Sequence, residues 1–364
     1  MFRFGFADPA VQQAGDAPLA VDEAGAGAGE DAIGAEEVLA SEAKPTGALE
    51  TLAVSPQLSL FKASGVVSNA QAASLLADDR LEENDLIEGV YEGGFKSWEG
   101  GVDLAQLLAA ALLQQQQQQE EGQQQQERQP PPPPQVEDEP AGQGPQEERQ
   151  QEGAAGPPPV QLSAESRVME LGCGHGLPGL VALWAGAEVH FQDYNRSVLS
   201  RLTIPNVAAN AGAWATRRAA AAASPGASAS SPAQQPPRAR YFAGSWEALP
   251  AVLEGLGLVG SYDMVLTAET IYSLEAMRSL YRCIKACLRP GAGVAYVAAK
   301  SYYFGVGGGT AAFRQLVEAD GVFACRAVAV VDDGVSNKRE VLELAPQRRQ
   351  GQARDEQRQE RAPR

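Results

Sequence analysis

Three glycines at alternate positions, Gly172, Gly174 and Gly176, form the stretch of this chain that is best suited to hold a ligand. The apolar run 168–171 before them predicts a buried strand, and helical spacing of apolar residues begins at Leu177. A glycine turn between a strand and a helix lets a nucleotide lie against bare backbone. The spacing is not the Gly-x-Gly-x-x-Gly of dinucleotide loops, and no Gly-Lys-Ser/Thr follows, which excludes a P-loop.

A second candidate is the carboxylate of Asp193, which follows the alternating apolar and polar segment 188–192. In doubly wound folds the residue that ends the second strand faces the ribose of the cofactor. A carboxylate there can accept hydrogen bonds from both ribose hydroxyls, and charged acceptors make the stronger hydrogen bonds. The alternative is an acidic residue that merely ends the strand. His190 in the same strand is expected to point to solvent or to a helix rather than to a ligand.

Two tryptophans and an aromatic loop are further candidates for ligand contact. The turn 244–246 places Trp246 where it could stack on a purine or cap the core. Trp98, in the glycine-rich and aromatic segment 84–104, either closes over the pocket or precedes a helix packed on the edge of the domain. The loop 301–309 contains three aromatic residues and four glycines, a mixture that suits a lid or a substrate channel.

The remaining periodicity predicts a doubly wound α/β fold that positions these groups. Strand patterns follow at 240–243, 262–266, 293–299, 322–331 and 336–344, and helical patterns at 102–112, 202–210, 274–288 and 313–317. Pro205 is expected to break the second of these helices. The last two strands, joined at 332–334, are expected to form an antiparallel hairpin. Seven strands ending in such a hairpin are typical of class I methyltransferases, whereas ordinary dinucleotide-binding sheets stay parallel.

Composition divides the 364 residues into one folded domain, its lid and several low-complexity segments. We expect a disordered acidic region at 1–80, a cofactor-lid segment at 81–113, a disordered Gln/Pro-rich insertion at 114–165, the methyltransferase-type domain at 166–344 with a disordered loop at 217–238, and a disordered basic tail at 345–364. Such segments cannot bury enough apolar surface to fold, and insertions are tolerated because loop-closure entropy grows slowly. Removal of residues 1–80 and 345–364 is therefore expected to leave folding and cofactor binding intact.

The net charge of −17 comes from the flanking segments, while residues 166–344 are close to neutral. A nearly neutral core argues against a nucleic-acid groove, which needs clustered Lys and Arg. The basic tail could bind nucleic acid, but a solvated end is the simpler interpretation. Four cysteines without a Cys-x-x-Cys pair, and two histidines, indicate no metal site and suit a reducing compartment. No apolar run of membrane-spanning length and no secretory pattern are present, so we expect a soluble intracellular protein.

Seven short motifs occur together in this chain: Gly89-Val-Tyr-Glu-Gly-Gly-Phe-Lys-Ser-Trp-Glu-Gly, Glu170-Leu-Gly-Cys-Gly-x-Gly-Leu-Pro-Gly, Phe191-Gln-Asp-Tyr-Asn, Pro205-Asn, Gly244-Ser-Trp, Thr267-Ala-Glu-Thr-Ile-Tyr and Tyr303-Phe-Gly-Val-Gly-Gly-Gly. The set resembles the protein-histidine N-methyltransferases, the histidine protein methyltransferase 1 family. The third and the last motif are far more specific than any glycine loop. The resemblance covers the ordered part, about half of the chain.

The resemblance implies S-adenosylmethionine as the cofactor and a histidine of the large-subunit ribosomal protein uL3 as the methyl acceptor, in the nucleus or cytoplasm. It implies that the cofactor is held by Ser97, Trp98, Glu99, Gly100, Gly101, Gly172, Gly174, Gln192, Asp193, Tyr194, Gly244, Ser245, Trp246 and Ala268. Members of the family usually have Ser at position 268, so here only backbone contact can carry over. The Gln/Pro-rich insertion is a second departure from the family pattern. We expect a monomer with a protein substrate and no membrane or core nucleic-acid contact.

Glu269 is the candidate for a catalytic role. Histidine has an ordinary pKa near 6.5, so a neutral imidazole already offers a lone pair, and the enzyme must supply position and the correct tautomer. We hypothesise that the Glu269 carboxylate accepts the N–H of the other ring nitrogen, although it could equally shape the loop by bonding to local backbone. Two other functions remain open: a protein-lysine methyltransferase of the same fold, and a non-catalytic interaction scaffold.

Overall fold

The computed structural model describes residues 34–44, 47–63, 69–76, 82, 87, 91, 93–128, 161–222, 237–303, 305, 307–332, 334 and 337–347. Its strands are β1 (Glu36–Val38), β2 (Leu49–Ala53), β3 (Ser59–Ala63), β4 (Arg167–Leu171), β5 (Glu188–Asp193), β6 (Ala239–Ala243), β7 (Met264–Ala268), β8 (Val294–Lys300), β9 (Phe323–Val331) and β10 (Arg339–Pro346). Its main helices are α1 (Asn69–Leu76), α2 (Glu99–Arg128), α3 (Leu177–Trp184), α5 (Ile204–Ala222), α6 (Leu249–Gly255), α7 (Leu274–Cys287) and α8 (Thr310–Asp320). A short helix α4 (Arg196–Val198) and a π-helical turn, Leu199–Thr203, lead into α5.

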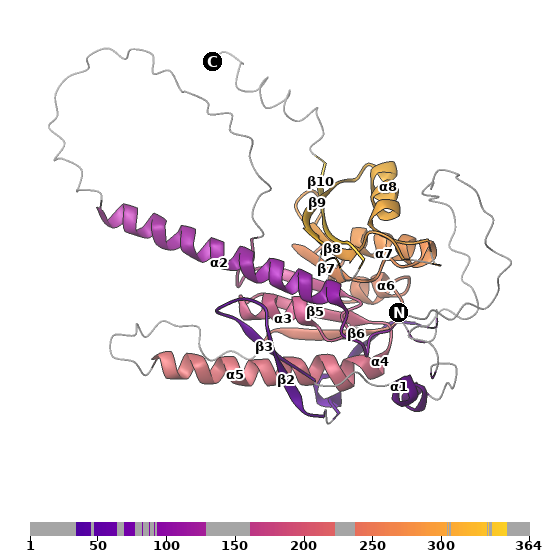
Figure 1. Cartoon of the computed structure of the whole chain (residues 1–364), viewed down its shortest axis with the longest axis horizontal. Helices are drawn as coiled ribbons and strands as arrows, with labels where there is room; N and C mark the ends of the chain where they lie inside the picture. Colours follow the sequence, from indigo (N-terminus) through magenta and orange to yellow (C-terminus); the bar gives the residue numbers. More distant parts are fainter. Residues whose placement is uncertain are drawn as a thin grey trace, which may run out of the picture.

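The central sheet has the strand order β1-β6-β5-β4-β7-β8-β10-β9 (Figure 1). Strands β6, β5, β4, β7 and β8 pair in parallel, and β10 lies antiparallel between β8 and β9. This order, with an antiparallel strand inserted next to the last one, is that of the class I methyltransferases, so the predicted fold class is confirmed. The sheet differs from the prediction in one respect, because β1 adds an eighth strand at the far edge.

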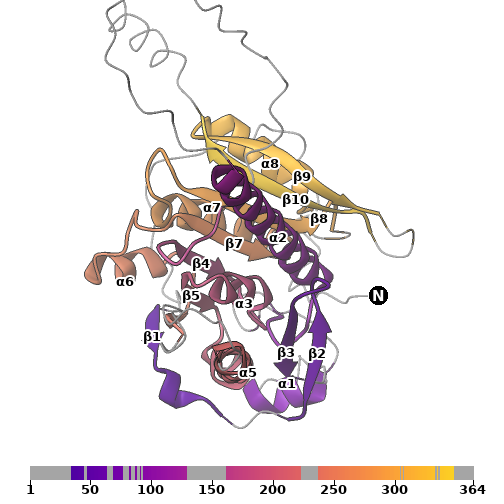
Figure 2. The same ribbon diagram turned by 90° about the vertical axis from the view of Figure 1, so that its left-hand side faces the viewer.

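Alternating residues of the strands feed two separate cores. Val168 of β4 packs in the cluster that contains Leu108 of α2 and Leu180 of α3, whereas its neighbour Met169 packs in the cluster that contains Leu280 of α7. Successive side chains of a strand point to opposite faces, so a fully buried strand supplies both cores. Helices α2, α3 and α5 therefore cover one face of the sheet, and α6, α7 and α8 cover the other (Figure 2).

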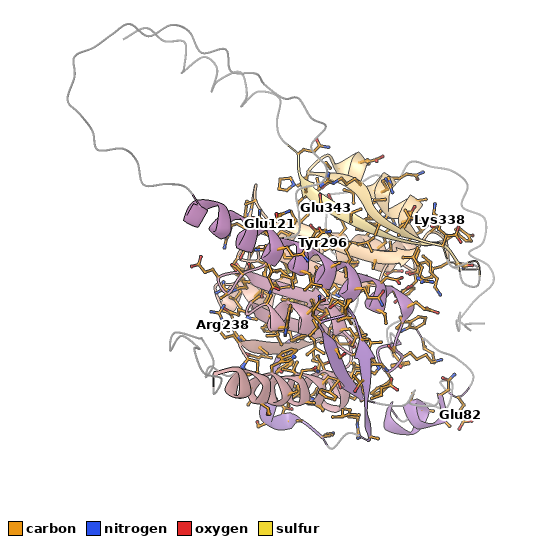
Figure 3. All side chains as sticks on the ribbon, turned by 60° about the vertical axis from the view of Figure 1, so that its left-hand side comes forward. Glu82, Glu121, Arg238, Tyr296, Lys338 and Glu343 are labelled. Atoms are coloured by element: carbon orange, nitrogen blue, oxygen red, sulfur yellow. The ribbon has the colours of Figure 1, made fainter. Side chains whose placement is uncertain are left out.

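The register of the antiparallel end is fixed by a buried polar contact. Tyr296 of β8 and Glu343 of β10 are cross-strand neighbours, labelled close together in Figure 3, and the Tyr296 hydroxyl donates to Glu343 Oε2 at 3.1 Å. Arg326 of β9 donates to the other carboxylate oxygen at 2.8 Å. A one-residue slip would place Glu343 on the opposite face without these partners, so the three groups specify the pairing.

The N-terminal part of the chain contradicts the prediction that residues 1–80 are disordered. Residues 36–38 form β1 against β6, and β2 and β3 form a hairpin beside α5 (Figures 1 and 2). Leu58 and Leu60 of this hairpin are completely buried in the main core. The Ala/Gly-rich composition hid these strands because each has only three to five residues. Residues 1–33 lie outside the described residues.

Three further boundaries differ from the prediction. Helix α2 continues through the glutamine run to Arg128, past the expected start of disorder at residue 114, and Figure 1 shows this end running beyond the sheet. Pro205 does not break a helix but stands at the second position of α5, directly after the π-helical turn. The π-helical turn directly before it accommodates the proline, which cannot donate a helix hydrogen bond, and the Lys44 N–H donates to the carbonyl of Ser200 in that turn at 2.8 Å. Helix α5 also extends to Ala222, into the expected loop at 217–238, whose central part lies outside the described residues.

Candidate active site

The glycine loop joins β4 to α3 in the conformation that its sequence requires. Gly172, Gly174 and Gly176 have φ angles of 62°, 49° and 71°, in the left-handed region that disfavours other residues. A Cβ at Gly172 would lie 2.6 Å from the Thr270 side chain, and one at Gly174 would lie 3.0 Å from the carbonyl oxygen of Gly94. The loop is thus a surface of bare backbone at the carboxyl end of a central strand, as predicted.

Gln192, at the carboxyl end of β5, ties the glycine loop to the turn after β6. Its Oε1 accepts from the Gly172 N–H at 3.1 Å and from the Trp246 indole N–H at 2.9 Å. Its Nε2 donates to the Gly244 carbonyl at 2.7 Å. One buried amide therefore brings together three of the predicted cofactor segments. Trp246 lies beside the glycine loop and is half-buried, which leaves part of its ring accessible to a ligand.

Asp193, at the carboxyl end of β5, is a buried acidic residue of the site. Its Oδ2 accepts from the Gly174 N–H at 2.9 Å and its Oδ1 from the Asn195 N–H at 3.1 Å. Burial raises the pKa of this carboxyl to about 6, although the backbone N–H groups, that of Gly174 foremost, act in the opposite direction. Each carboxylate oxygen has two acceptor positions, so the side chain keeps acceptor capacity for ligand hydroxyls.

The segment before α2 lies across the carboxyl ends of the strands. A Cβ at Gly94 would be 3.0 Å from Asp193 Oδ2, and the Gly100 N–H donates to Glu269 Oε1 at 3.2 Å. Residues 94–100 therefore reach from the end of β5 to the end of β7. The interpretation as a helix packed on the domain is confirmed for α2. That Ser97, Trp98 and Glu99 close over a cofactor stays a prediction.

The side chains of this segment contact its own backbone and Lys300 of β8. The Trp98 indole N–H donates to the Gly93 carbonyl at 3.0 Å, and Lys300 Nζ lies 6.0 Å from the centre of its ring. Glu99 Oε2 is 3.9 Å from the same ammonium group and has no hydrogen-bond partner in the described part of the chain. Lys300 belongs to β8 and was not among the predicted site residues.

Glu269 follows β7 and has the only positive φ, 59°, among the described non-glycine residues. Such a conformation is strained and is maintained only when surrounding contacts fix it. Those contacts are the Gly100 N–H on Oε1 and the Tyr303 hydroxyl, which donates to Oε2. Burial raises the pKa of the Glu269 carboxyl, and the bond from Tyr303 and the charge of Lys300 lower it in part. Burial and the adjacent Glu269 also raise the pKa of Tyr303.

The other predicted cofactor residues occupy the same edge with different surroundings. Ser97 is exposed, while Tyr194, Gly101 and Ala268 are half-buried. The Ser245 hydroxyl accepts from the Ala248 N–H at 3.2 Å, at the start of α6, so this side chain supports a helix.

A cavity of about 620 Å³ opens at the carboxyl ends of β5 and β6. It is lined by Tyr194, Asn195, Ala243 and Gly244, and on the outer side by the N-terminal residues Gly34, Glu36, Glu42 and Lys44 together with Arg196, Ser197 and Ser200. The N-terminal contribution was missed in the sequence because this region was predicted to be disordered.

Both histidines are buried away from solvent. His190 was expected to face solvent or a helix, but it is fully buried, with Nε2 2.9 Å from Glu188 Oε1 and Nδ1 2.8 Å from the Tyr262 hydroxyl. Burial lowers the pKa of both His175 and His190 to about 4. The described residues contain no His, Cys, Asp and Glu cluster that could hold a metal ion. None of the described helices is long and apolar enough to cross a membrane.

These features define a class of protein: a doubly wound α/β domain of class I methyltransferase topology, with a glycine loop, a buried acidic residue and a covering segment at one edge of its sheet. This class uses a nucleoside cofactor, and the bare glycine backbone and the Asp193 carboxylate fit one.

Curated relatives narrow this class. The chain is 32% identical over 264 residues to the histidine protein methyltransferase 1 homolog of Dictyostelium discoideum. The matched region covers 72% of this chain and 61% of that protein. It is 30% identical over 301 residues to the homolog of Bos taurus, and this matched region covers 79% of this chain and 64% of that protein. The predicted resemblance to the histidine protein methyltransferase 1 family is therefore confirmed. The chain spans about three fifths of the length of these relatives, 61% and 64%.

No protein-family model matches the chain. Among solved structures, a TehB-like SAM-dependent methyltransferase from Corynebacterium glutamicum covers 52% of this chain and 83% of its own length, with 13% identity and a TM-score of 0.34. Because that score is low, the fold assignment rests on the strand order.

Proposed function

We propose that this protein is an S-adenosylmethionine-dependent protein-histidine N-methyltransferase. The observation that carries the proposal is the convergence of the glycine loop, Asp193 and Glu269 at one edge of the sheet beneath the segment 94–100. The similarity to histidine protein methyltransferase 1 homologs supports histidine as the acceptor. Bound S-adenosylmethionine would supply an electrophilic methyl group on a sulfonium ion.

In this proposal the cofactor lies along the carboxyl ends of β4 and β5. The backbone of Gly172 and Gly174 approaches the cofactor closely, Asp193 accepts its ribose hydroxyls, and the cavity beside Tyr194 and Gly244 receives its base. The segment 94–100 shields the site from water, which strengthens electrostatic contacts inside it.

The acceptor nitrogen would approach from the end of β7, between Glu269 and the loop that carries Tyr303. A neutral imidazole nitrogen would displace the methyl group from the sulfonium of bound S-adenosylmethionine, which would leave as the neutral thioether S-adenosylhomocysteine, and the proton of the other ring nitrogen would pass to solvent. Glu269 can orient that N–H and stabilise the cation, because its oxygens retain acceptor capacity beyond the two bonds from Gly100 and Tyr303. The same two bonds support the alternative that Glu269 mainly shapes the loop, and both roles can coexist in one residue.

Two rival functions are separated from this proposal by simple observations. A protein-lysine methyltransferase would modify lysine in the same assay, and it would need to deprotonate an amine with an ordinary pKa near 10.4. A scaffold would bind no S-adenosylmethionine. The intact glycine loop and Asp193 argue against the scaffold, since neither is needed for a purely structural domain.

We further propose a histidine of ribosomal protein uL3 as the target and the cytoplasm and nucleus as the location, with the protein acting as a monomer. The test is methyl transfer from isotope-labelled S-adenosylmethionine to purified, unmodified large ribosomal subunits, followed by amino-acid analysis. Label in methylhistidine of uL3 supports the proposal. Label in methyllysine, or labelled histidine in another protein only, contradicts the acceptor or the target.

A further inference from the structure

Two asparagines of α5 dock the N-terminal hairpin onto the domain. Asn210 accepts from the Phe61 N–H at 2.9 Å and donates to the Phe61 carbonyl at 2.7 Å. Asn206, one turn earlier, accepts from the Ala63 N–H at 2.8 Å. Both side chains are completely buried. The two amides therefore pair with the edge of β3 as a neighbouring strand would, which satisfies backbone groups that a buried edge would leave unpaired.

Asn206 differs from Asn210 in its second partner. Its Nδ2 donates at 3.0 Å to the carbonyl of His175, in the glycine loop. Thr203, three residues earlier on the same helical run, donates to the carbonyl of Gly174 at 2.7 Å. Asn210 Nδ2 instead donates to the Asn206 carbonyl, within its own helix.

The orientation of the Asn206 amide follows from its partners. The Ala63 N–H can only donate and the His175 carbonyl can only accept, so the oxygen must face the hairpin and the nitrogen must face the loop. Both bonds depend on one planar group. The hairpin therefore fixes the amide in the orientation in which its nitrogen donates to the glycine loop.

The glycine loop needs such external support because its own residues constrain it weakly. Glycines adopt many conformations, and three of the five residues 172–176 are glycines. Gln192 and Asp193 hold N–H groups of the loop, whereas Thr203 and Asn206 hold its carbonyl groups. Both the backbone N–H groups and the backbone carbonyl groups of the loop are thus held by hydrogen bonds with surrounding side chains.

We propose that Asn206 is a positioning residue that, oriented by its bond to the N-terminal hairpin β2–β3, holds the glycine loop and so preorganises the cofactor site. The inference rests on the proposed function only for the identity of the cofactor. It makes the hairpin strands β2 and β3 a supporting part of the site, although no residue of β2 or β3 lines its cavity.

The test compares Asn206→Ala with Asn210→Ala in the full chain. Both variants remove bonds to β3, but only the first removes a bond to the glycine loop. We expect Asn206→Ala to raise the Kd for S-adenosylmethionine in calorimetry by roughly five- to thirtyfold, the factor that one lost buried hydrogen bond produces. Asn210→Ala should change that Kd by less than about twofold. In the cofactor-free protein, hydrogen exchange at the Gly174 and Gly176 amides should accelerate in Asn206→Ala alone, whereas exchange at Phe61 should accelerate in Asn210→Ala.

A third variant separates the two bonds of Asn206. Asn206→Asp keeps an acceptor for the Ala63 N–H but faces the His175 carbonyl with a second oxygen, so it should disturb the loop and spare the hairpin. Equal changes in Asn206→Ala and Asn210→Ala, or unchanged loop exchange in the Asn206 variants, would overturn the proposal. If Asn206→Ala does not fold, the milder Asn206→Ser takes its place in the same comparison. Absence of S-adenosylmethionine binding by the wild type would contradict the proposed function, while the exchange data would still decide the role of Asn206.

Discussion

Asp193 combines burial with an ionisable group that the proposed cofactor must contact. Replacing it with alanine removes a charged acceptor, which contributes about 1.5–3 kcal/mol to a hydrogen bond. We therefore expect Asp193→Ala to weaken S-adenosylmethionine binding by roughly tenfold or more in calorimetry. The exposed Glu254→Gln is the matched control and should bind normally. An unchanged Kd for Asp193→Ala would contradict the ribose assignment.

The same residue should make cofactor binding depend on pH. Burial raises the pKa of Asp193 to about 6, so the carboxyl becomes protonated as the pH falls below that value. A protonated carboxyl loses an acceptor and its charge, and the bound state favours the ionised form. Affinity for S-adenosylmethionine should therefore be constant at high pH and fall as the pH drops through about 6. A flat profile between pH 8 and 5 for the wild type, or the same decline in Asp193→Asn, would contradict this account.

Substitution of Glu269 changes its hydrogen bonds as well as its charge, so a comparison variant is needed. Both of its oxygens accept from donors, so Glu269→Gln turns an NH2 group toward either Gly100 or Tyr303. Tyr303→Phe removes only the second contact and serves as the matched comparison. If the carboxylate orients the acceptor ring, Glu269→Gln should lower kcat by at least about tenfold with S-adenosylmethionine saturating, and Tyr303→Phe should lower it less. A normal kcat with a raised cofactor KM in both variants would assign Glu269 to loop shape alone.

At the scale of elements, α2 is held to the sheet by a buried ion pair. Arg339 Nε of β10 lies 2.5 Å from Asp103 Oδ2, and the two side chains are 7% and 11% exposed. Removing one partner of a buried pair costs about 3–5 kcal/mol because the other charge is left uncompensated. Asp103→Asn should therefore lower the free energy of unfolding by several kcal/mol in chemical denaturation. Glu37→Gln, which breaks the half-exposed pair with Arg240, should cost less than about 1 kcal/mol. Equal decreases in the free energy of unfolding for the two variants would mean that the buried Asp103–Arg339 pair stabilises the fold no more than the half-exposed pair.

Elements with strong periodicity could be predicted from the sequence, and those with weak periodicity could not. The run before Gly172 and the alternation before Asp193 mark β4 and β5 within one residue. In contrast, β1 has three residues, and β3 with the residue before it presents only Leu60 and Leu58 to the main core, which is too few to stand out in an Ala/Gly-rich region. The glutamine run looks disordered by composition, yet glutamine is a good helix former and α2 continues into it.

Some residues of the site could be identified from the sequence and others could not. Motif positions such as Gln192, Asp193 and Glu269 could be selected from the sequence, and the structure brings them to one edge of the sheet. Lys300 could not, and Asn206, although it belongs to the Pro205-Asn motif, could be given no role, because both roles depend on contacts over a long separation in the chain. The Asn206–Ala63 bond, for example, spans 143 residues.

At the scale of the whole molecule, the N-terminal strands belong to the folded domain. Removal of residues 1–80 was expected to be harmless, but it would expose the core around Leu58 and Leu60, each of which contributes about 1.5–3 kcal/mol of burial. Total stability is only about 5–15 kcal/mol. A chain starting at residue 34 should therefore melt in calorimetry at the temperature of the full chain. A chain starting at residue 64 should melt at a much lower temperature. Equal melting temperatures for the two truncations would contradict the described core.

The two histidines provide a test of the whole fold, since they are the only ones in the chain. Burial lowers both pKa values to about 4, so both rings should stay neutral at pH 5.5. Between pH 4 and 6.5 the unfolded chain binds the extra protons, so each histidine lowers stability by about 1.4 kcal/mol per pH unit as the pH falls. Buried carboxyls such as Asp193 act in the opposite direction, so the ring signals in NMR isolate the histidines. Midpoints near 6.5 in the folded, tag-free protein would show that the rings are accessible.

The central claim is that this protein methylates histidine in a protein with S-adenosylmethionine as donor. The most direct measurement is mass spectrometry of histidine-containing peptides from cells that have lost the protein and are then supplied with the wild type or Asp193→Ala. We predict a uL3 peptide whose histidine is methylated with the wild type and unmethylated without it or with Asp193→Ala. Histidine peptides that remain identical in all three samples, or a change confined to methyllysine, would contradict the claim.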